Sequence, residues 1–241
     1  MPRSARQAHS TFRPRPPIDD ETAEEVLRHG TVDVLGRMPW SSNATFLVDV
    51  LPTEPGPVEC LLQGVYKPGR GERLLHDFPP GLYRREIAAW ELARHLGWGL
   101  IPPTVLRDGP LGEGSVQLYV PCDYDEHYFT ILEDPAHADD LRRLALFDLL
   151  VNNTDRKGGH CLKGNDGRVW GIDHGLTFHA EQKLRTVIWE FSGQELPGNH
   201  VKDLKRLETS LGGADAPLAR EVNSLLDPEE SAMLRRRIRA F

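Results

Sequence analysis

Two short stretches of the sequence hold side chains suited to chemistry, and in each an apolar run stops shortly before an aspartate. The stretch LLVNNTDRKGGHCL, residues 149–162, contains Asp155, and His160 follows five positions later. The stretch VWGIDHGLTF, residues 169–178, places Asp173 between an apolar run and a glycine. Taken alone, either aspartate is an ordinary turn residue, because aspartate accepts local backbone hydrogen bonds.

A lysine and a glutamate earlier in the chain complete the set that phosphoryl transfer needs. In kinases, a strand lysine holds the nucleotide phosphates and a helix glutamate positions it; one aspartate orients the attacking hydroxyl, and another binds magnesium. The chain has these residue types in the same order: Lys67, Glu86, Asp155 and Asp173. The kinase pattern H-R-D-x-x-x-x-N also places a metal-binding side chain five residues after its aspartate, where this chain has His160.

Two cations directly follow the first aspartate. We expect Arg156 and Lys157 to stabilise charge on the transferring phosphoryl group, because that transition state spreads negative charge over its equatorial oxygens. The alternative is that both are surface charges of a loop. His174 and His179 would suit a metallohydrolase instead, but the sequence lacks an H-E-x-x-H or comparable spacing.

The elements that must position these residues change character along the chain. Strand-like runs fill most of the segment from Val32 to about Cys122, and one helix-like run, GLYRREIAAWELARHLG, interrupts them. After Asp139 the sequence reads largely as helix, in DDLRRLALFDLLVNN, DAPLAREVNSLL and DPEESAMLRRRIRAF. A strand-rich half followed by a helix-rich half predicts an α+β fold. The absence of regular βαβ alternation argues against a doubly wound sheet.

The 241 residues suit one large core or two small lobes. We predict a disordered basic arm over residues 1–20, because its proline and arginine content cannot bury enough surface to offset the entropy of ordering. An N-terminal nucleotide-binding lobe then covers residues 21–121, and a C-terminal catalytic lobe covers residues 122–241.

Composition excludes several classes of protein. A net charge of −7 argues against general binding to nucleic acid or to anionic membranes. Three widely spaced cysteines without a CxxC pair favour neither a disulfide framework nor a zinc ribbon, and they indicate a reducing cytoplasm. No signal-peptide core and no run of about 18 apolar residues is present, so we predict no transmembrane segment.

Several motifs together resemble a known group. NNTDRKGGHCL followed by WGIDHGLTF is similar to the catalytic loop and metal-binding motif of the phosphatidylinositol 3-/4-kinase-like superfamily, particularly type II phosphatidylinositol 4-kinases and their small bacterial relatives. WSSNATFLVDV, residues 40–50, resembles that group's serine-containing phosphate-binding loop. YRREIAAWELARHLG and IPPTVL resemble a helix and strand of its N-terminal lobe. The resemblance spans roughly residues 32–178 and implies a two-lobed protein-kinase-like fold.

The resemblance also implies roles for single residues. Asp155 would be the catalytic aspartate, Asp173 the magnesium ligand, and Lys67 a phosphate contact paired with Glu86. The other expected nucleotide contacts are backbone N–H groups over the phosphates and hinge residues near the adenine: Ser41, Ser42, Asn43, Tyr119 and Val120. The implied activity is transfer of the γ-phosphate of ATP to a hydroxyl of a protein, a small molecule or a phosphoinositide.

One departure from the family pattern concerns the metal. The family has asparagine where this chain has His160, and magnesium prefers oxygen ligands, so we expect either a preference for Mn²⁺ over Mg²⁺ or a weak second metal site. The departure leaves a non-catalytic nucleotide-binding module as the main alternative. Adenylyl transfer, in which the nucleotide binds in the reverse orientation, is a further alternative activity.

Two features outside these motifs are expected to be structural. Trp189 and Phe191 are expected to pack in the core, with substrate docking as the alternative. The C-terminal run LRRRIRAF is expected to form a solvated helix face, with contact to an anionic lipid or partner as the alternative.

Overall fold

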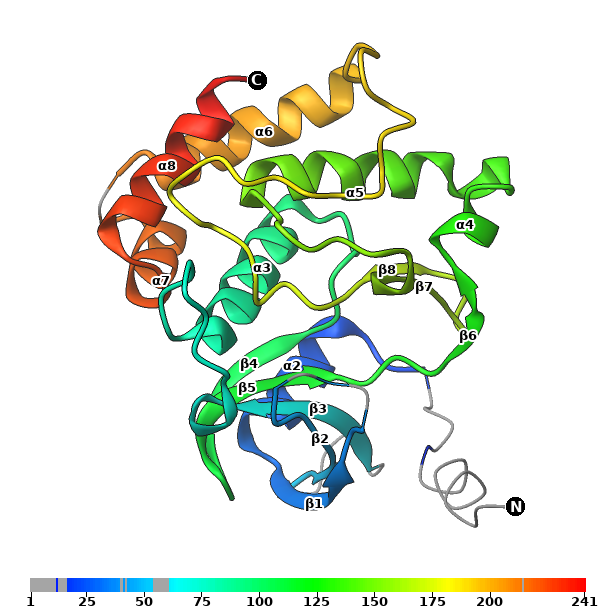
Figure 1. The fold of residues 1–241 in the computed structure, drawn as a ribbon, viewed down its shortest axis with the longest axis vertical. Helices are drawn as coiled ribbons and strands as arrows, with labels where there is room; N and C mark the ends of the chain where they lie inside the picture. The colour runs from blue at the N-terminus through cyan, green and yellow to red at the C-terminus, as the bar shows by residue number, and fades with distance from the viewer. Residues whose placement is uncertain (1–11, 13–16, 40, 42, 54–60, 214) are drawn as a thin grey trace. The chain divides into compact units, whose positions relative to one another are not determined.

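The computed structural model describes residues 12, 17–39, 41, 43–53, 61–213 and 215–241. The chain divides into two compact units: unit 1 holds Met1–Tyr83 and Pro102–Cys122, and unit 2 holds Arg84–Ile101 and Asp123–Phe241. Strands dominate unit 1 and helices dominate unit 2 (Figure 1). The predicted α+β class is therefore confirmed.

Unit 1 is built on an antiparallel sheet with one helix. The sheet has five strands in the order β1-β2-β3-β5-β4. Its elements are α2 (Asp20–His29), β1 (Thr31–Arg37), β2 (Phe46–Leu51), β3 (Leu62–Pro68), β4 (Thr104–Gly109) and β5 (Gly112–Leu118), with a 3₁₀ turn η1 at Gly69–Gly71. Strand β3 is central and pairs with β2 on one side and β5 on the other.

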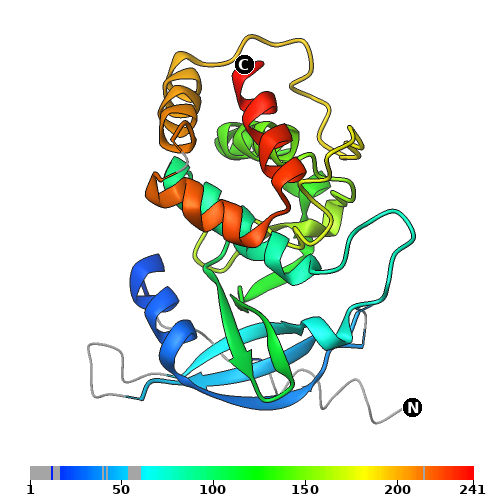
Figure 2. The same ribbon diagram turned by 90° about the vertical axis from the view of Figure 1, so that its left-hand side faces the viewer.

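Helix α2 covers one face of this sheet (Figure 2). Its N-terminus is capped by Asp19, whose side chain accepts a hydrogen bond from the backbone N–H of Thr22 at 2.8 Å, and this bond lowers the pKa of Asp19. The helix and the facing strand residues share one apolar core, which comprises Ala23, Val26, Leu27, Val48, Val50, Leu62, Tyr66, Val105, Val116 and Leu118. Side chains alternate along a strand, so Lys67 of β3 points away from this core.

Unit 2 is mostly helical. Its elements are α3 (Leu82–Leu96, whose first two residues belong to unit 1), β6 (Cys122–His127, whose first residue also belongs to unit 1), α4 (Tyr128–Ile131), α5 (Ala138–Val151), β7 (Cys161–Gly164), β8 (Val169–Gly171), α6 (Gly198–Leu211), α7 (Pro217–Leu225) and α8 (Pro228–Arg239). Two 3₁₀ turns, η2 (Pro135–His137) and η3 (Gly158–His160), complete it. The short strands form a sheet in the order β6-β7-β8.

A second apolar core lies around α5. Leu144, Phe147 and Val151 of α5 are fully buried and belong to one apolar cluster with residues of α3, α6, α7 and α8. Asp148 lies on the same helix and is also fully buried. A buried carboxylate needs partners, so its presence in an apolar helix indicates a polar network at this end of α5.

The helices predicted from the runs at residues 81–97 and 139–153 are confirmed as α3 and α5, and the two predicted C-terminal helices are confirmed as α7 and α8. Helix α6 was not predicted, although Leu204, Leu207 and Leu211 have helical spacing. Strand β6 was also missed, because its sequence CDYDEH lacks the apolar alternation of a half-buried strand.

Some expectations about single segments were wrong, and others lie outside the described residues. Trp189 is 56% exposed, so the expectation of core packing fails there, whereas Phe191 packs against the core of unit 2. The C-terminal arginine run is not a uniformly solvated face, because Arg235 and Arg237 donate inward to backbone carbonyls. Most of the predicted arm, residues 1–20, is not described, and its disorder stays a prediction.

The described part of the chain contains no helix with the length and apolar character needed to cross a membrane. The free cysteines among the described residues are Cys122 and Cys161, and burial raises the pKa of the Cys161 thiol to about 12. Cys161 is therefore an unreactive thiol at neutral pH.

Candidate active site

The loop that carries Asp155 begins at a left-handed residue. Helix α5 ends at Val151, and Asn152 follows with a φ of 51°, a conformation that asparagine tolerates better than most residues. The Asn152 side chain donates to the backbone carbonyls of His179 and Glu181, at 2.9 and 2.7 Å, and accepts from the N–H of Lys183 at 3.0 Å. Asn152 thus fixes the end of α5 to residues 179–183.

A buried ion pair organises the loop. The Arg156 guanidinium donates from Nε and Nη2 to the Asp148 carboxylate, at 2.9 and 2.8 Å, and neither side chain is exposed. The same carboxylate accepts from Nδ2 of Asn153 at 2.9 Å and from Oγ1 of Thr186 at 3.1 Å. Burial opposes the charge on Arg156, but the Asp148 carboxylate outweighs it and raises the pKa of Arg156 above its usual range.

This burial gives Arg156 a different task from the one expected. A guanidinium enclosed by Asp148 cannot reach a transferring phosphoryl group, so the expectation of direct charge stabilisation does not fit its position. Its Nη1 instead donates to the carbonyls of His160 and Ile172, at 3.2 and 2.9 Å. Arg156 therefore joins the loop after Asp155 to the segment that leads into Asp173.

Asp155 itself lies near the surface of unit 2, with 15% of its side chain exposed. Its Oδ1 lies 2.6 Å from Nη2 of Arg185, and its Oδ2 lies 2.6 Å from Nζ of Lys157. Its backbone N–H donates to Oδ1 of Asn153 at 3.0 Å. Arg185 was not foreseen, because it lies 30 residues away in an irregular segment with no recognisable motif.

Asp173 follows β8 and also adopts a left-handed backbone, with a φ of 60°. Such residues are uncommon outside turns and functional sites. The N–H of Ile172 donates to the His160 carbonyl at 3.0 Å, and the N–H of Thr154 donates to the Leu176 carbonyl at 2.9 Å. These bonds, with those of Arg156, hold the Asp155 and Asp173 segments together within unit 2.

His160 lies beside Asp173, with 3.5 Å between Nε2 and Oδ2. Burial lowers the pKa of His160, and the neighbouring Asp173 only partly offsets this, so the imidazole is neutral at neutral pH. Its Nδ1 is buried and has no hydrogen-bond partner within the described part of the chain. A neutral imidazole next to a carboxylate is a donor set that fits a divalent cation.

No three His, Cys, Asp or Glu side chains among the described residues are grouped so that they could hold a metal ion. A cation at His160 and Asp173 would therefore need further ligands, and nucleotide phosphates provide such oxygens. The donor set thus fits a metal that arrives with a nucleotide better than a permanent metal centre.

Glu86 of α3 reaches the same region of unit 2. Its Oε2 accepts from the N–H of His174 at 2.9 Å, and both residues are buried. Nη2 of Arg156 lies 2.7 Å from Nε2 of His174. Because a guanidinium can only donate, Nε2 of His174 accepts this hydrogen bond. His174 is thus held by Glu86 and Arg156, and the metallohydrolase alternative gains no support. Pairing of Glu86 with Lys67 of unit 1 stays a prediction.

The remaining expected nucleotide contacts lie in unit 1. Lys67 is half-buried on β3, opposite Ser115 of β5. Oγ of Ser41 lies 2.7 Å from Oγ1 of Thr45, and Oδ1 of Asn43 accepts from the N–H of Arg73 at 2.9 Å. These bonds shape the connection between β1 and β2. Ser42 lies outside the described residues.

The two expected hinge residues follow β5. The N–H of Tyr119 donates to the Gln63 carbonyl at 2.9 Å, and its ring stacks on Phe12, with 4.9 Å between centroids and 17° between planes. Val120 is buried. Tyr119 thus continues the bonding between β5 and β3 beyond the pair of Leu118 and Gly64.

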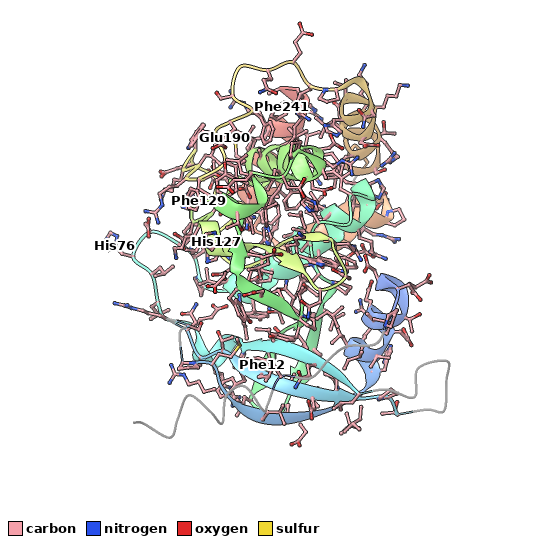
Figure 3. The ribbon with its side chains drawn as sticks, turned by 90° about the vertical axis from the view of Figure 1, so that its right-hand side faces the viewer. Phe12, His76, His127, Phe129, Glu190 and Phe241 are labelled. Atoms are coloured by element: carbon pink, nitrogen blue, oxygen red, sulfur yellow. The ribbon has the colours of Figure 1, made fainter. Side chains whose placement is uncertain are left out.

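Aromatic side chains border the Asp155 loop. Phe129 is 58% exposed and lies over Gly158, where a Cβ would be 3.0 Å from the Phe129 ring. The hydroxyl of Tyr128 donates to Glu190, and Figure 3 shows His127, Phe129 and Glu190 on the same side of unit 2. Glycine at 158 therefore permits the close approach of the ring.

The C-terminal helix also contributes to this region. Nε of Arg237 in α8 donates to the carbonyl of Leu150, in the last turn of α5, at 2.8 Å. Burial lowers the pKa of Arg237 to about 10, which still leaves the guanidinium charged at neutral pH. A terminal carbonyl of α5 thus has a charged donor, which favours this helix end.

Comparison with known proteins places the chain among kinase-like folds. No family model matches the sequence. Protein Rv2133c of Mycobacterium tuberculosis is 41% identical over 257 residues, which cover 92% of this chain and 89% of that protein.

Two solved structures are similar in fold. The Golgi casein kinase with Mn/ADP bound has a TM-score of 0.59 and 15% identity, over 90% of this chain and 73% of its own. Hydra Fam20 with sugar has a TM-score of 0.58 and 14% identity, over 92% of this chain and 86% of its own. At this identity the likeness shows the fold alone, and the predicted protein-kinase-like fold is confirmed.

Proposed function

The chain belongs to the same family as the mycobacterial Protein Rv2133c, and we propose that it is an ATP-dependent phosphotransferase. The observation that carries this proposal is the joining of two motifs in unit 2. Arg156 and Ile172 hold the segments of Asp155 and Asp173 together, as a catalytic carboxylate and a metal ligand require. The kinase-like fold supports the same class of reaction.

Asp155 orients the acceptor and takes its proton. The acceptor hydroxyl oxygen forms a bond to the γ-phosphorus of ATP, and the bond between that phosphorus and the bridging oxygen of the ADP leaving group breaks. The hydroxyl proton passes to the Asp155 carboxylate. Lys157, with 59% of its side chain exposed, is placed to meet negative charge on the transferring group.

His160 and Asp173 would hold the divalent cation. When bound, Mg²⁺ or Mn²⁺ neutralises charge on the phosphates. The neutral imidazole of His160 favours Mn²⁺ relative to the asparagine that the resemblance to the phosphatidylinositol 3-/4-kinase-like superfamily implies, because a nitrogen ligand suits manganese better than magnesium.

The nucleotide contacts are assigned residue by residue. Lys67 contacts the phosphates and Glu86 positions it, as the resemblance to the phosphatidylinositol 3-/4-kinase-like superfamily implies. Arg156 is assigned a positioning role, because its guanidinium is enclosed by Asp148. The other nucleotide contacts keep their expected roles: Ser41, Ser42, Asn43, Tyr119 and Val120.

The acceptor is a hydroxyl compound, and we place a protein or a small molecule before a phosphoinositide. The exposed ring of Phe129, which lies over Gly158 of the Asp155 loop, offers a surface for part of such an acceptor. The second candidate function is a nucleotide-binding module without transfer, which the histidine at position 160 favours.

The test is turnover of ATP by the purified chain with Mg²⁺ or Mn²⁺. We expect transfer or hydrolysis of the γ-phosphate, and a loss of at least about 100-fold in both Asp155→Asn and Asp173→Asn. Asp215→Asn removes the same charge from an exposed turn between α6 and α7 and should leave turnover unchanged.

Three other outcomes have defined meanings. Full activity in both variants rejects the assignment of Asp155 and Asp173. A rise in Tm with ATP but no release of γ-phosphate identifies a binding module. Transfer of label from α-labelled ATP to an acceptor identifies adenylyl transfer.

A further inference from the structure

Both oxygens of the Asp155 carboxylate are held by cations, and the two cations differ in how they are attached. Arg185 lies on Oδ1 and Lys157 lies on Oδ2, each at 2.6 Å. A carboxylate that accepts a proton from an acceptor needs one oxygen available to it. Each oxygen has a second lone pair, so release of one cation clears space at its oxygen for the acceptor hydroxyl, and the other cation can remain.

The main chain of Arg185 is fixed to the catalytic loop. Its N–H donates to the Asn153 carbonyl at 2.8 Å, and its carbonyl accepts from the N–H of Arg156 at 3.0 Å. On either side, the N–H of Lys183 donates to Asn152, and Thr186 donates to the buried Asp148. Arg185 thus rests on a segment attached at four points to the end of α5 and its loop.

The Arg185 side chain is nonetheless 75% exposed. Exposure makes a core-packing role unsuitable, because most of its surface contacts solvent. The described contact that uses its charge is the one with Asp155. A planar guanidinium can hold one oxygen of a carboxylate in a defined direction, which a mobile ammonium does less well.

Lys157 has a weaker attachment. It precedes Gly158 and Gly159, and 59% of its side chain is exposed. A flexible four-carbon stem that ends in a compact ammonium exchanges partners more readily than a planar guanidinium on a segment fixed by hydrogen bonds. Lys157 is therefore the cation that leaves when phosphate arrives.

We propose that Arg185 is a positioning residue for the reaction: it holds Oδ1 of Asp155 throughout turnover, while Lys157 releases Oδ2 to the acceptor hydroxyl. This inference rests on the proposed phosphotransferase function. Arg185 touches neither nucleotide nor acceptor in this scheme and acts through the direction of the Asp155 carboxylate. Misplacement of a catalytic group by about 1 Å can cost on the order of 100-fold in rate.

The kinetic test uses Arg185→Ala, Arg185→Lys and Lys183→Ala. We expect kcat to fall about 10- to 100-fold in Arg185→Ala, with KM for ATP changed less than about twofold, because positioning and not nucleotide binding is lost. Arg185→Lys should retain part of the activity. Lys183→Ala removes a charge from the same segment, where its ammonium lies 3.7 Å from Glu181, and should behave as wild type.

Chemical rescue separates positioning from a structural role. Arg185 is exposed, so free guanidinium can occupy the space that Arg185→Ala leaves, at concentrations far below those that unfold proteins. We expect guanidinium to restore several-fold activity to Arg185→Ala and to leave Lys183→Ala unaffected. Unchanged kcat in Arg185→Ala overturns the proposal, and so does a loss that neither guanidinium nor lysine restores.

A measurement without turnover keeps this inference distinct from the proposed function. The carboxyl-carbon NMR signal of Asp155 is identified by its disappearance in Asp155→Asn. We expect this signal to shift in Arg185→Ala and to stay in place in Lys183→Ala, even if no acceptor is phosphorylated. An inactive wild type would reject the proposed function, whereas an unmoved Asp155 signal in Arg185→Ala would overturn the role of Arg185.

Discussion

At the scale of single residues, we propose that His160 sets the metal preference of the site. Asparagine offers an oxygen where histidine offers a nitrogen, and magnesium prefers oxygen. We expect His160→Asn to raise turnover with Mg²⁺ relative to Mn²⁺ by at least about threefold, measured as the ratio of kcat/KM for the two metals. An unchanged ratio would remove His160 from the metal site.

The lowered pKa of His160 also predicts how the unfolding free energy depends on pH. Burial places this pKa below the usual value of 6.5, so the folded protein holds fewer protons on this group than the unfolded chain as the pH falls below 6.5. The unfolding free energy therefore falls as the pH drops below 6.5, because the unfolded chain takes up a proton more readily than the buried ring. The drop in unfolding free energy between pH 7 and pH 5 should be smaller in His160→Asn than in wild type.

The sequence is informative at this scale only where a motif exists. Asp155 and Asp173 stand out because each follows an apolar run in a recognisable pattern. Arg185 does not, since its partner is distant in sequence and its segment has no regular structure. The burial of Arg156 was missed too, although Asp148 within FDLLV was a usable signal: a lone acid in an apolar helix needs a cation.

At the scale of elements, the pair of Asp148 and Arg156 joins α5 to the loop that follows it. Arg156→Met leaves a buried carboxylate without its cation, and such a change costs about 3–5 kcal/mol of unfolding free energy. Lys157→Met removes the neighbouring exposed cation and should cost within about 1 kcal/mol. Urea unfolding of both variants checks this, and equal losses would contradict a structural role for Arg156.

Element prediction succeeded where side chains follow a clear period. Helix α5 and strand β3 were predicted from apolar spacing and chain punctuation. Helix α6 starts at Gly198 after Pro197 without a side-chain cap, so it lacked the usual start signal. Strand β6 carries mostly exposed charged residues, and hydrogen bonding to β7 defines it rather than its own sequence.

At the scale of the whole molecule, the residues that the structure describes form two apolar cores, one in each unit. Leu62 belongs to the core of unit 1 and Leu144 to that of unit 2, and both are fully buried. Truncation of either to alanine should cost about 2–5 kcal/mol. Hydrogen exchange should show lost protection confined to the unit that carries the change, and equal loss in both units would contradict independent cores.

The α+β class could be predicted because the order of strand-rich and helix-rich segments is visible directly in the sequence. The composition of the units did not follow, because residues 84–101 are flanked by unit 1 in sequence and yet group with unit 2. Contacts between distant segments decide this, such as the ion pair between Arg85 and Glu230. A linear pattern does not contain that information.

The contact between Arg237 and Leu150 has a consequence for biosynthesis. Helix α8 leaves the ribosome after every other element described here. The nascent chain therefore contains α5 and both aspartate segments before Arg237, the charged donor to the end of α5, is available. A prematurely terminated product that lacks α8 would therefore carry every catalytic side chain and still have an unsupported helix end beneath them. Full support of this helix end would come only once α8 has been made.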